Sequence, residues 1–479
     1  MSTEFTRTRK TGISAIYWTV TSGLLVIPGV ARTKAAATFF DFDGLALFGQ
    51  VSQLQTLLVS IGAIGLTTAA RIALSRQSLA PQNRRRMAAW LLYWPTGISA
   101  IFSAGAMFFS PFLSSVITGD PGNWPVVAIA ALGIPFAVAT QQCIAIAQSY
   151  GETSRLLSAS AIAATLGAAS IFFLMFGSDA TTGAISFLVA PLIQFIVVAS
   201  FLKPIRLAIR TRPSASRSLR AEVLRIGAGS AVLGSAAAGA DLGARSAVVG
   251  EFGLDSIAAF QPVVLIVTQL FGLALSALAT SSMVTYSSSS KDQIGETVRA
   301  LVISFVPLVG ILSALGIAFS PLLVSVFFTN TLIDASVPLI ALALSGEVLR
   351  SSSWLVGSAL LPVGARRAWL TVGMLTVTVQ FAVGVSAGIA WGALGLVIGV
   401  TCANLFAVVA QVIAVRRVGI NISVVALFLP IFISIALFIS FAATYEPGSY
   451  FIPGALIPAG LIAGLLAIRS FLGKGVRAK

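Results

Sequence analysis

The chain has 479 residues, of which 57% are hydrophobic and only 9% are charged, and its mean hydropathy is +0.98. Soluble proteins carry about 25% charged residues, so this composition excludes a soluble fold and indicates a multi-pass membrane protein. The formal net charge of +15 then indicates basic loops beside an anionic leaflet rather than a nucleic-acid partner.

The N-terminus begins with basic residues and continues with more than twenty largely apolar ones. That run is too long for a signal peptide, and we expect an uncleaved first helix. A spanning helix needs about 20 mostly apolar residues. On this criterion the sequence predicts fourteen spans, at residues 12–36, 45–73, 87–117, 124–149, 155–177, 182–203, 221–249, 255–284, 294–319, 333–360, 367–391, 393–415, 420–441 and 450–471.

Lys and Arg residues test this topology. If the N-terminus is cytoplasmic, 26 of the 30 fall at the two termini or beside the cytoplasmic ends of the spans, whereas acidic residues dominate the opposite connectors. This alternation follows the positive-inside rule and predicts that both termini are cytoplasmic. Four residues depart from it: Arg32, Lys34, Arg245 and Arg350.

Two pairs of segments indicate an internal duplication. Asp43-Gly-Leu-Ala-Leu-Phe48 resembles Asp255-Ser-Ile-Ala-Ala-Phe260 at an offset of 212, and Ser110-Pro-Phe-Leu-Ser-Ser-Val116 resembles Ser320-Pro-Leu-Leu-Val-Ser-Val326 at an offset of 210. Each half contains six helices, so both halves start on the same side of the membrane, as in transporters that rock two parallel lobes about a central site.

We therefore predict an all-α integral membrane protein with two parallel six-helix lobes followed by two further helices. The predicted parts are an N-lobe at 1–203, a basic cytoplasmic linker at 204–220, a C-lobe at 221–415, and helices 13 and 14 with a basic tail at 416–479.

The charged residues inside the spans are the candidate functional residues. Subtracting the repeat offset of 212 places Arg245 at position 33, between Arg32 and Lys34, so both lobes bring cations to one depth. Snorkelling to headgroups is one interpretation, but the symmetry favours a central cationic cavity. Asp41-Phe-Asp43 resembles a metal-binding Asp-x-Asp motif, yet Asp43 and Asp255 hold equivalent places before a helix, and helix capping is the preferred interpretation.

Two carboxylates accompany these cations. Asp241 and Arg245 are four residues apart, and Glu347 and Arg350 three apart, spacings that put each pair on one helix face. Arg350 lies near the predicted midplane, where a lone charge costs at least roughly 2.5–3.5 kcal/mol. Each pair could be purely structural. We favour pairs in which an anionic substrate or a proton exchanges with the internal partner.

A family resemblance rests on these segments: Asp43–Leu54, Gly62–Gly65, the repeat at 252–270, and the connectors Gly151–Arg155 and Gly364–Arg367. They resemble Wzx-type polysaccharide flippases, the PST family of the MOP superfamily, which also includes lipid II flippases and MATE exporters; the first two resemble the start of such proteins. The resemblance implies alternating access, a cationic cavity for a diphosphate, and a bacterial plasma-membrane location. The additional helix pair resembles the lipid II flippase branch.

The expected function is transfer of a polyprenyl-diphosphate-linked oligosaccharide to the outer leaflet for cell-surface polysaccharide biosynthesis. Arg32, Lys34, Arg245 and Arg350 are expected to bind the diphosphate, and Asp241 and Glu347 to pair with them or couple transport to protons or sodium. We expect a monomer that uses no cofactor and no metal, since the chain lacks histidine and its two cysteines, Cys143 and Cys402, lie in apolar runs.

Three alternatives remain open: a MATE-like ion-coupled drug exporter, a lipid II flippase, and a polytopic glycan polymerase. Four basic against two acidic intramembrane residues favour an anionic substrate over a cationic drug. The polymerase is the least favoured, because every predicted outer connector is short, with thirteen residues at most, and none gathers a catalytic cluster.

Overall fold

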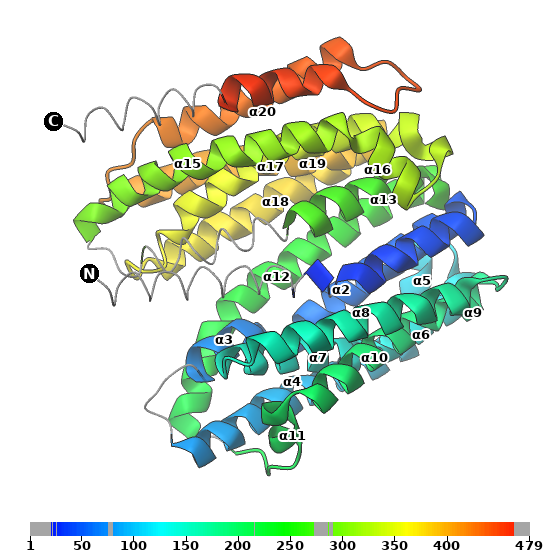
Figure 1. The fold of residues 1–479 in the computed structure, drawn as a ribbon, viewed down its shortest axis with the longest axis vertical. Helices are drawn as coiled ribbons and strands as arrows, with labels where there is room; N and C mark the ends of the chain where they lie inside the picture. The colour runs from blue at the N-terminus through cyan, green and yellow to red at the C-terminus, as the bar shows by residue number, and fades with distance from the viewer. Residues whose placement is uncertain are drawn as a thin grey trace. The chain divides into compact units, whose positions relative to one another are not determined.

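The structure, a computed structural model, describes residues 26–74, 80–214, 216–272 and 291–463, together with positions 21, 23, 24 and 286. All regular secondary structure in these ranges is helical (Figure 1), which confirms the all-α prediction. Eleven helical segments of the described residues, some of them made of consecutive helices, are long and apolar enough to cross a membrane. Helices suit this composition because each satisfies its own backbone hydrogen bonds in hydrocarbon.

The other three predicted spans lie partly outside the described residues. Residues 26–39 of the first span region are helical. Leu254–Val267 is a shorter apolar helix within the eighth, and Pro453–Ala463 is one within the fourteenth. The described chain therefore contains at least part of every predicted span.

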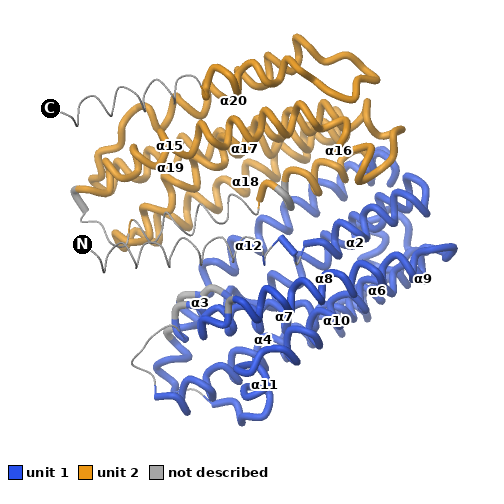
Figure 2. Tube along the Cα trace, in the orientation of Figure 1, with its two compact units in different colours: residues 1–258 blue, residues 259–479 orange. Residues whose placement is uncertain are grey.

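The chain divides into two compact units, Met1–Ala258 and Ala259–Lys479 (Figure 2). This division is based on which helices pack together. The predicted boundary at 204–220 is based on the sequence repeat, and the two lie at different positions. The predicted lobe boundary stays a prediction.

Unit 1 is built mainly on helices that pack through small residues. Its helices are α2 (Phe42–Ala63), α3 (Leu66–Leu74), α4 (Pro81–Phe108), α5 (Ser110–Thr118), α6 (Trp124–Leu132), α7 (Ile134–Ser149), α8 (Thr153–Met175), α9 (Ala180–Ala184), α10 (Ser186–Phe201), α11 (Lys203–Ile209) and α12 (Arg217–Phe252). α10 packs on α7 and α8, and α4 packs on α7. Many core residues at these contacts are alanines, which let membrane helices approach closely.

Unit 2 is organised around a helix that is buried along most of its length, α17 (Ile333–Ser358). The remaining elements are α13 (Gln261–Val263), the π-helix η3 (Val264–Phe271), α15 (Lys291–Ala318), α16 (Ser320–Phe327), α18 (Arg366–Trp391), α19 (Ala393–Arg417) and α20 (Val425–Thr444). α17 packs on α15, α19 and α20, and α18 packs on α19.

The proposed duplication is supported by repeated local structure. α4 and α15 each have 28 residues and an internal proline, Pro95 and Pro307. Phe109 then ends α4 with φ −92° and ψ 14°, and Phe319 ends α15 with φ −96° and ψ 3°. A short helix beginning Ser-Pro follows in both halves, because proline fits the first turn of a helix, where its missing N–H is not needed.

α12 lies along α2 and α3, and this contact places the main charged cluster of unit 1. Ile64 and Gly65 separate α2 from α3 with φ values of 48° and 61°. A Cβ on Gly65 would lie 2.1 Å from the carbonyl oxygen of Gly227 in α12, so only glycine permits this approach. Further along, Gly239 of α12 faces Leu57 of α2, and the two helices therefore run antiparallel.

Candidate functional site

The charged cluster of unit 1 joins α12 to α2. Arg245 donates from Nη2 to Oδ2 of Asp241, one helical turn earlier. Gln53 of α2 donates from Nε2 to the same carboxylate oxygen at 2.6 Å. The pairing expected from the spacing is present, with an additional donor from another helix. Two donors thus converge on one oxygen and fix both the carboxylate and the facing helices.

Burial differs between the two charged partners. The Arg245 side chain is 3% exposed and that of Asp241 is 20% exposed. The carboxylate is therefore the accessible partner, and the guanidinium lies behind it. A buried guanidinium is costly without a counter-charge, so Asp241 stabilises Arg245 in its place. A ligand that competes for Arg245 has to replace this carboxylate with an anion of its own.

The Arg32 side chain is buried in unit 1 against α10. It is 8% exposed. Nε donates to the Ser186 hydroxyl at 3.2 Å and Nη2 to the Ser186 carbonyl at 3.1 Å. The guanidinium also lies 4.1 Å from the centre of the Phe187 ring. These α10 residues give the Arg32 guanidinium partners within the protein, and its predicted contact with a diphosphate stays a prediction.

Lys34 does not share a helix face with Arg32. The two residues are two positions apart in the helix at 26–39, which rotates their side chains about 200° from each other. Lys34 is half-buried, and its carbonyl accepts a hydrogen bond from Thr38 at 2.7 Å. Its proposed contact with a diphosphate stays a prediction.

The charged pair of unit 2 lies within α17. Arg350 Nη2 is 2.6 Å from Glu347 Oε2, and the side chains are 20% and 2% exposed. The guanidinium lies 5.3 Å from the centre of the Trp354 ring. In contrast to the α12 pair, the cation is here the accessible partner, so an anion can approach Arg350 while Glu347 stays buried.

The packing of α17 on α19 positions Glu347. The carbonyl of the preceding residue, Gly346, accepts a hydrogen bond from Asn404 Nδ2 at 3.2 Å. A Cβ on Gly346 would lie 3.0 Å from the Thr401 hydroxyl. The absence of a side chain at Gly346 thus lets the two helices approach beside the buried carboxylate.

The structure therefore brings together two of the predicted sets, Asp241 with Arg245 and Glu347 with Arg350. It does not join Arg32 to Arg245, because Arg32 contacts α10 and Arg245 is tied to Asp241 of its own helix, which α2 contacts. The single cavity predicted for all four cations stays a prediction.

Sequence reasoning missed Gln53 and Ser186. α2 contains glutamines at positions 50, 53 and 55, and polar residues in a spanning helix are a recognisable signal. Two of the three have purely structural partners: Gln50 donates to the Ile117 carbonyl, and Gln55 to those of Ala130 and Phe187. Only packing between distant segments distinguishes Gln53 from them.

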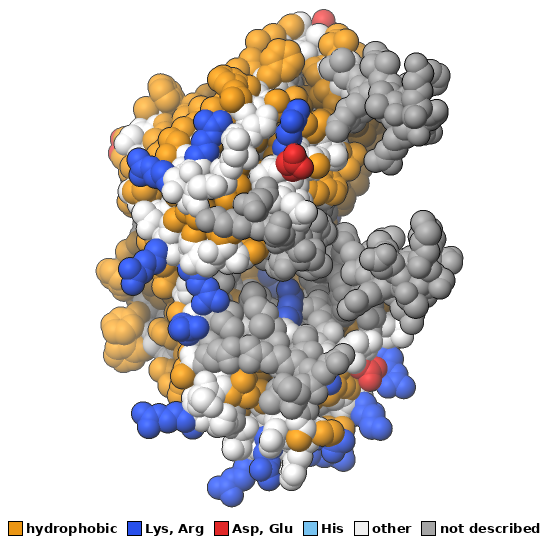
Figure 3. All heavy atoms as spheres, turned by 90° about the vertical axis from the view of Figure 1, so that its left-hand side faces the viewer, with side chains coloured by type: hydrophobic (Ala, Val, Ile, Leu, Met, Phe, Trp, Pro, Cys, Tyr) orange, Lys and Arg blue, Asp and Glu red, His pale blue; other side chains and the backbone are white. Residues whose placement is uncertain are grey.

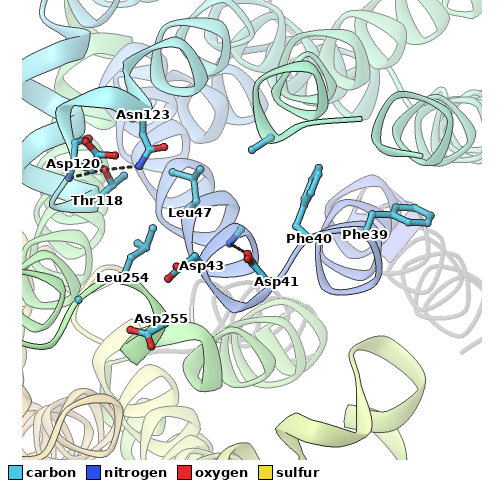
Figure 4. A pocket seen from close by; sticks show the side chains of 13 residues that line it. Phe39, Phe40, Asp41, Asp43, Leu47, Thr118, Asp120, Asn123, Leu254 and Asp255 are labelled. Carbon is cyan, nitrogen blue, oxygen red and sulfur yellow. Dashed lines mark hydrogen bonds between the residues drawn. The ribbon is translucent and has the colours of Figure 1, made fainter. Parts of the chain in front are cut away.

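A pocket of about 780 Å³ lies where α12 ends and α2 begins, at the opposite end of α12 from the basic linker. Its lining includes Asp41, Asp43, Asp120 and Asp255 (Figure 4). The prediction that Asp43 caps α2 was wrong, because the capping residue is Asp41. Asp41, in the extended conformation that a cap requires, accepts from the Gly44 N–H, and Asp43 follows within the first turn.

Asp255 likewise lies in the first turn of the 3-10 helix η2 (Leu254–Phe260) and not before it. Within the described ranges, no group of three or more His, Cys, Asp or Glu side chains is arranged as a metal centre.

Comparison with solved structures identifies the fold. An inward-facing multidrug resistance MATE transporter of the MOP superfamily aligns with a TM-score of 0.67 and 16% identity, covering 82% of this chain and 94% of that one. The lipid II flippase MurJ, in an inward closed conformation, aligns with a TM-score of 0.68 and 10% identity, covering 95% and 98%.

A MOP-superfamily transporter from Pyrococcus furiosus, whose binding pocket is described as having reverse polarity, aligns with a TM-score of 0.61 and 14% identity, covering 85% of this chain and 95% of that one. No family model and no curated protein sequence matches the chain. The chain is thus a multi-pass membrane protein with the fold shared by the MATE transporters of the MOP superfamily and the lipid II flippase MurJ.

Proposed function

We propose that this protein is a flippase that moves a polyprenyl-diphosphate-linked oligosaccharide from the cytoplasmic to the outer leaflet of a bacterial plasma membrane. The observation that carries the proposal is the pair of carboxylate-bound arginines, Arg245 and Arg350, on membrane-spanning helices. A charged side chain within a membrane span costs free energy, and such residues usually serve a function. A diphosphate supplies the oxygen acceptors that a guanidinium binds best.

The exchange of partners at Arg245 gives transport a physical basis. Without substrate, Asp241 accepts from Arg245 and Gln53. A diphosphate that binds Arg245 displaces the carboxylate, which stays near Gln53 or takes up a proton or sodium ion. At the second pair a diphosphate approaches the more exposed Arg350, and Glu347 remains its buried counter-charge. The polyprenyl tail remains in the bilayer throughout, and the protein uses differential binding of the head group to shift between inward and outward states.

The extent of the structural matches favours a lipid-linked substrate. MurJ aligns over 95% of this chain, whereas the MATE transporter aligns over 82%. A fold that extends to α20 and the helix after it offers more apolar surface for a long hydrocarbon tail. The excess of basic over acidic residues within the spans adds to this, because a cavity for cationic drugs needs the opposite balance.

A MATE-like exporter of cationic compounds is the second candidate, supported by the MATE alignment at a TM-score of 0.67. Proteoliposomes containing the wild-type chain separate the two. We expect transfer of a fluorescent diphosphate-linked lipid oligosaccharide between leaflets and no efflux of a cationic dye. Dye efflux without lipid transfer would contradict the flippase and favour the exporter. Transfer of lipid II alone would retain a flippase but assign it to the lipid II branch.

A further inference from the structure

α11 is a seven-residue amphipathic helix that lies against α4. Its apolar side is buried through Ile205 and Ala208, each 0% exposed, whereas Lys203 and Arg206 on the other side are exposed. Because its apolar face is packed on the protein, α11 turns its basic face outward.

Two hydrogen bonds hold the end of α11 and the chain after it against α4. The Tyr93 hydroxyl donates to the Ile209 carbonyl at 2.7 Å, and the Ser214 N–H donates to the Arg86 carbonyl at 3.4 Å. Tyr93 and Arg86 are seven residues apart in α4, about 10 Å along its axis. The linker therefore follows the first turns of α4 and leads directly into α12.

This arrangement gathers exposed positive charge from three helices. We define the basic collar as the exposed residues Arg85, Arg86, Arg206, Arg210, Arg212 and Arg217. Segments 81–86 and 203–220, which supply it, contain no Asp or Glu. Figure 3 shows several Lys and Arg side chains and few Asp or Glu side chains on one face of the molecule. The positive N-terminal poles of α4 and α12 add to the same potential.

Arg84 differs from the collar, although it adjoins Arg85. Its Nη2 donates to the Ser149 carbonyl at 2.6 Å, and its guanidinium lies 4.0 Å from the centre of the Tyr150 ring. Arg84 thus joins α4 to the end of α7. The same helix turn therefore contains one arginine with a packing role and two whose side chains face outward.

Exposed aromatic residues lie on α4 next to the collar. Tyr93 and Trp94 are 42% and 48% exposed, and the Trp90 and Trp94 rings stack with centres 6.3 Å apart. Trp and Tyr favour the headgroup level of a bilayer. Tyr93 and Trp94 follow Arg86 by about two helical turns along α4, so the collar lies nearer the start of the helix than the aromatic residues do.

We propose that the basic collar binds the headgroups of anionic glycerophospholipids and anchors this end of unit 1 in the leaflet that the positive-inside rule predicts to be cytoplasmic. The phosphodiester oxygens accept hydrogen bonds from the collar guanidinium groups, and Trp94 packs against the glycerol and upper acyl region. The proposal concerns bulk membrane lipid and is independent of the transported substrate.

Binding of short-chain phosphatidylglycerol and phosphatidylcholine to the detergent-solubilised chain, measured by thermal shift, tests the proposal. Each basic residue near an anionic surface contributes about a fivefold change in binding. We therefore expect wild type to prefer phosphatidylglycerol, and Arg206→Gln/Arg210→Gln/Arg212→Gln to reduce that preference at least tenfold. The matched control Arg366→Gln/Arg367→Gln/Arg417→Gln removes three exposed arginines of unit 2 and should reduce the preference less than the collar variant does.

Substitution of the same three collar residues by Lys keeps the charge and should preserve binding, which separates loss of charge from loss of folding. Equal binding of both lipids by wild type, or an equal loss in the matched control, would overturn the proposal. Displacement of phosphatidylglycerol by an equimolar amount of inorganic phosphate would also overturn it, because the site would then recognise free phosphate.

Discussion

Gln53 and Arg245 donate to the same oxygen of Asp241, and the two donors have different consequences. Arg245 forms the ion pair with Asp241, and the carboxylate is the counter-charge that the buried guanidinium needs. Gln53 is neutral and comes from another helix, so it positions the carboxylate. Removing Gln53 leaves the ion pair present but free to turn.

We predict that Gln53→Leu lowers the free energy of unfolding by about 2 kcal/mol, since a hydrogen bond to a charged group is lost, and reduces lipid transfer more than its effect on stability explains. Melting temperature and initial transfer rate in proteoliposomes measure the two effects. Thr56→Val is a suitable control, because Thr56 is exposed and bonds only within α2. Equal rates for Gln53→Leu and wild type would show that the carboxylate needs no second donor.

Arg32 allows a sharper separation of structural and substrate roles. Its guanidinium is already occupied by Ser186 and Phe187. We predict that Arg32→Ala lowers the free energy of unfolding by about 2–4 kcal/mol, measured by thermal melting in detergent. A variant that melts like wild type but no longer transfers lipid would instead place Arg32 in substrate binding.

The sequence predicted the two charged pairs because their partners lie within one helical turn. It did not reveal Gln53 or Ser186, because their contacts with Asp241 and Arg32 join residues separated by 188 and 154 positions. Local spacing carries no information about such contacts. The charged residues of the candidate site could therefore be predicted from the sequence, whereas the neutral residues that form hydrogen bonds with them could not.

Breaks within the helices are the element-scale features that the sequence resolved least well. The span predicted at 87–117 is two helices, α4 and α5, interrupted at Phe109 because Ser110 and Pro111 start a new helix. The span predicted at 45–73 is broken at Ile64 and Gly65. Apolar length predicts a crossing of the membrane, but the second break depends on Gly227, which is far away in sequence.

The close approach of Gly65 to α12 makes a clear prediction about stability. Gly65→Ala should lower the free energy of unfolding by more than about 2 kcal/mol, since alanine is strained at positive φ and its Cβ would lie 2.1 Å from the Gly227 carbonyl oxygen. Thermal melting in detergent measures the change.

Gly234→Ala is the matched control. Gly234 lies within α12 and has open space at its Cβ position, so alanine should stabilise the helix by about 1 kcal/mol. If both substitutions raised the free energy of unfolding, the close approach of Gly65 to Gly227 of α12 would be contradicted.

The connector after α20 contains a titratable contact with α17. The Tyr445 hydroxyl donates to Asp334 Oδ1 at 3.3 Å, and the Gly448 N–H donates to the same atom at 2.9 Å. Burial, followed by the negative charge of Asp334, raises the pKa of Tyr445 to about 12. An unfolded tyrosine has a pKa of about 10.

Because the folded state disfavours the ionised phenol, the stability contributed by Tyr445 is complete below pH 10 and is lost as the pH rises from about 10 to about 12. We predict that Tyr445→Phe is less sensitive to alkali over this interval. Melting temperatures of wild type and variant between pH 9 and 12 measure the difference. Parallel curves would show that Tyr445 does not titrate within the folded connector.

At the scale of the whole molecule, composition alone established a multi-pass helical protein, and the alternation of basic and acidic connectors predicted fourteen spans. The structure describes eleven complete candidate spans and parts of the other three. The repeated pattern of α4–α5 and α15–α16 supports the duplication. The substrate was not predictable in the same way, because related folds accommodate chemically different cargo.

The central claim is that Arg245 and Arg350 bind the diphosphate of a lipid-linked oligosaccharide. The most direct test is transfer of such a fluorescent lipid by proteoliposomes containing wild type, Arg245→Ala, Arg350→Ala and the exposed control Arg367→Ala. An additional variant, Asp241→Ala/Arg245→Ala, avoids leaving the carboxylate without its counter-charge. We predict at least a tenfold loss in every variant that lacks Arg245 or Arg350, with folding retained and the control unaffected. Undiminished transfer by both Arg245→Ala and Arg350→Ala would contradict the claim and leave these arginines with a structural role.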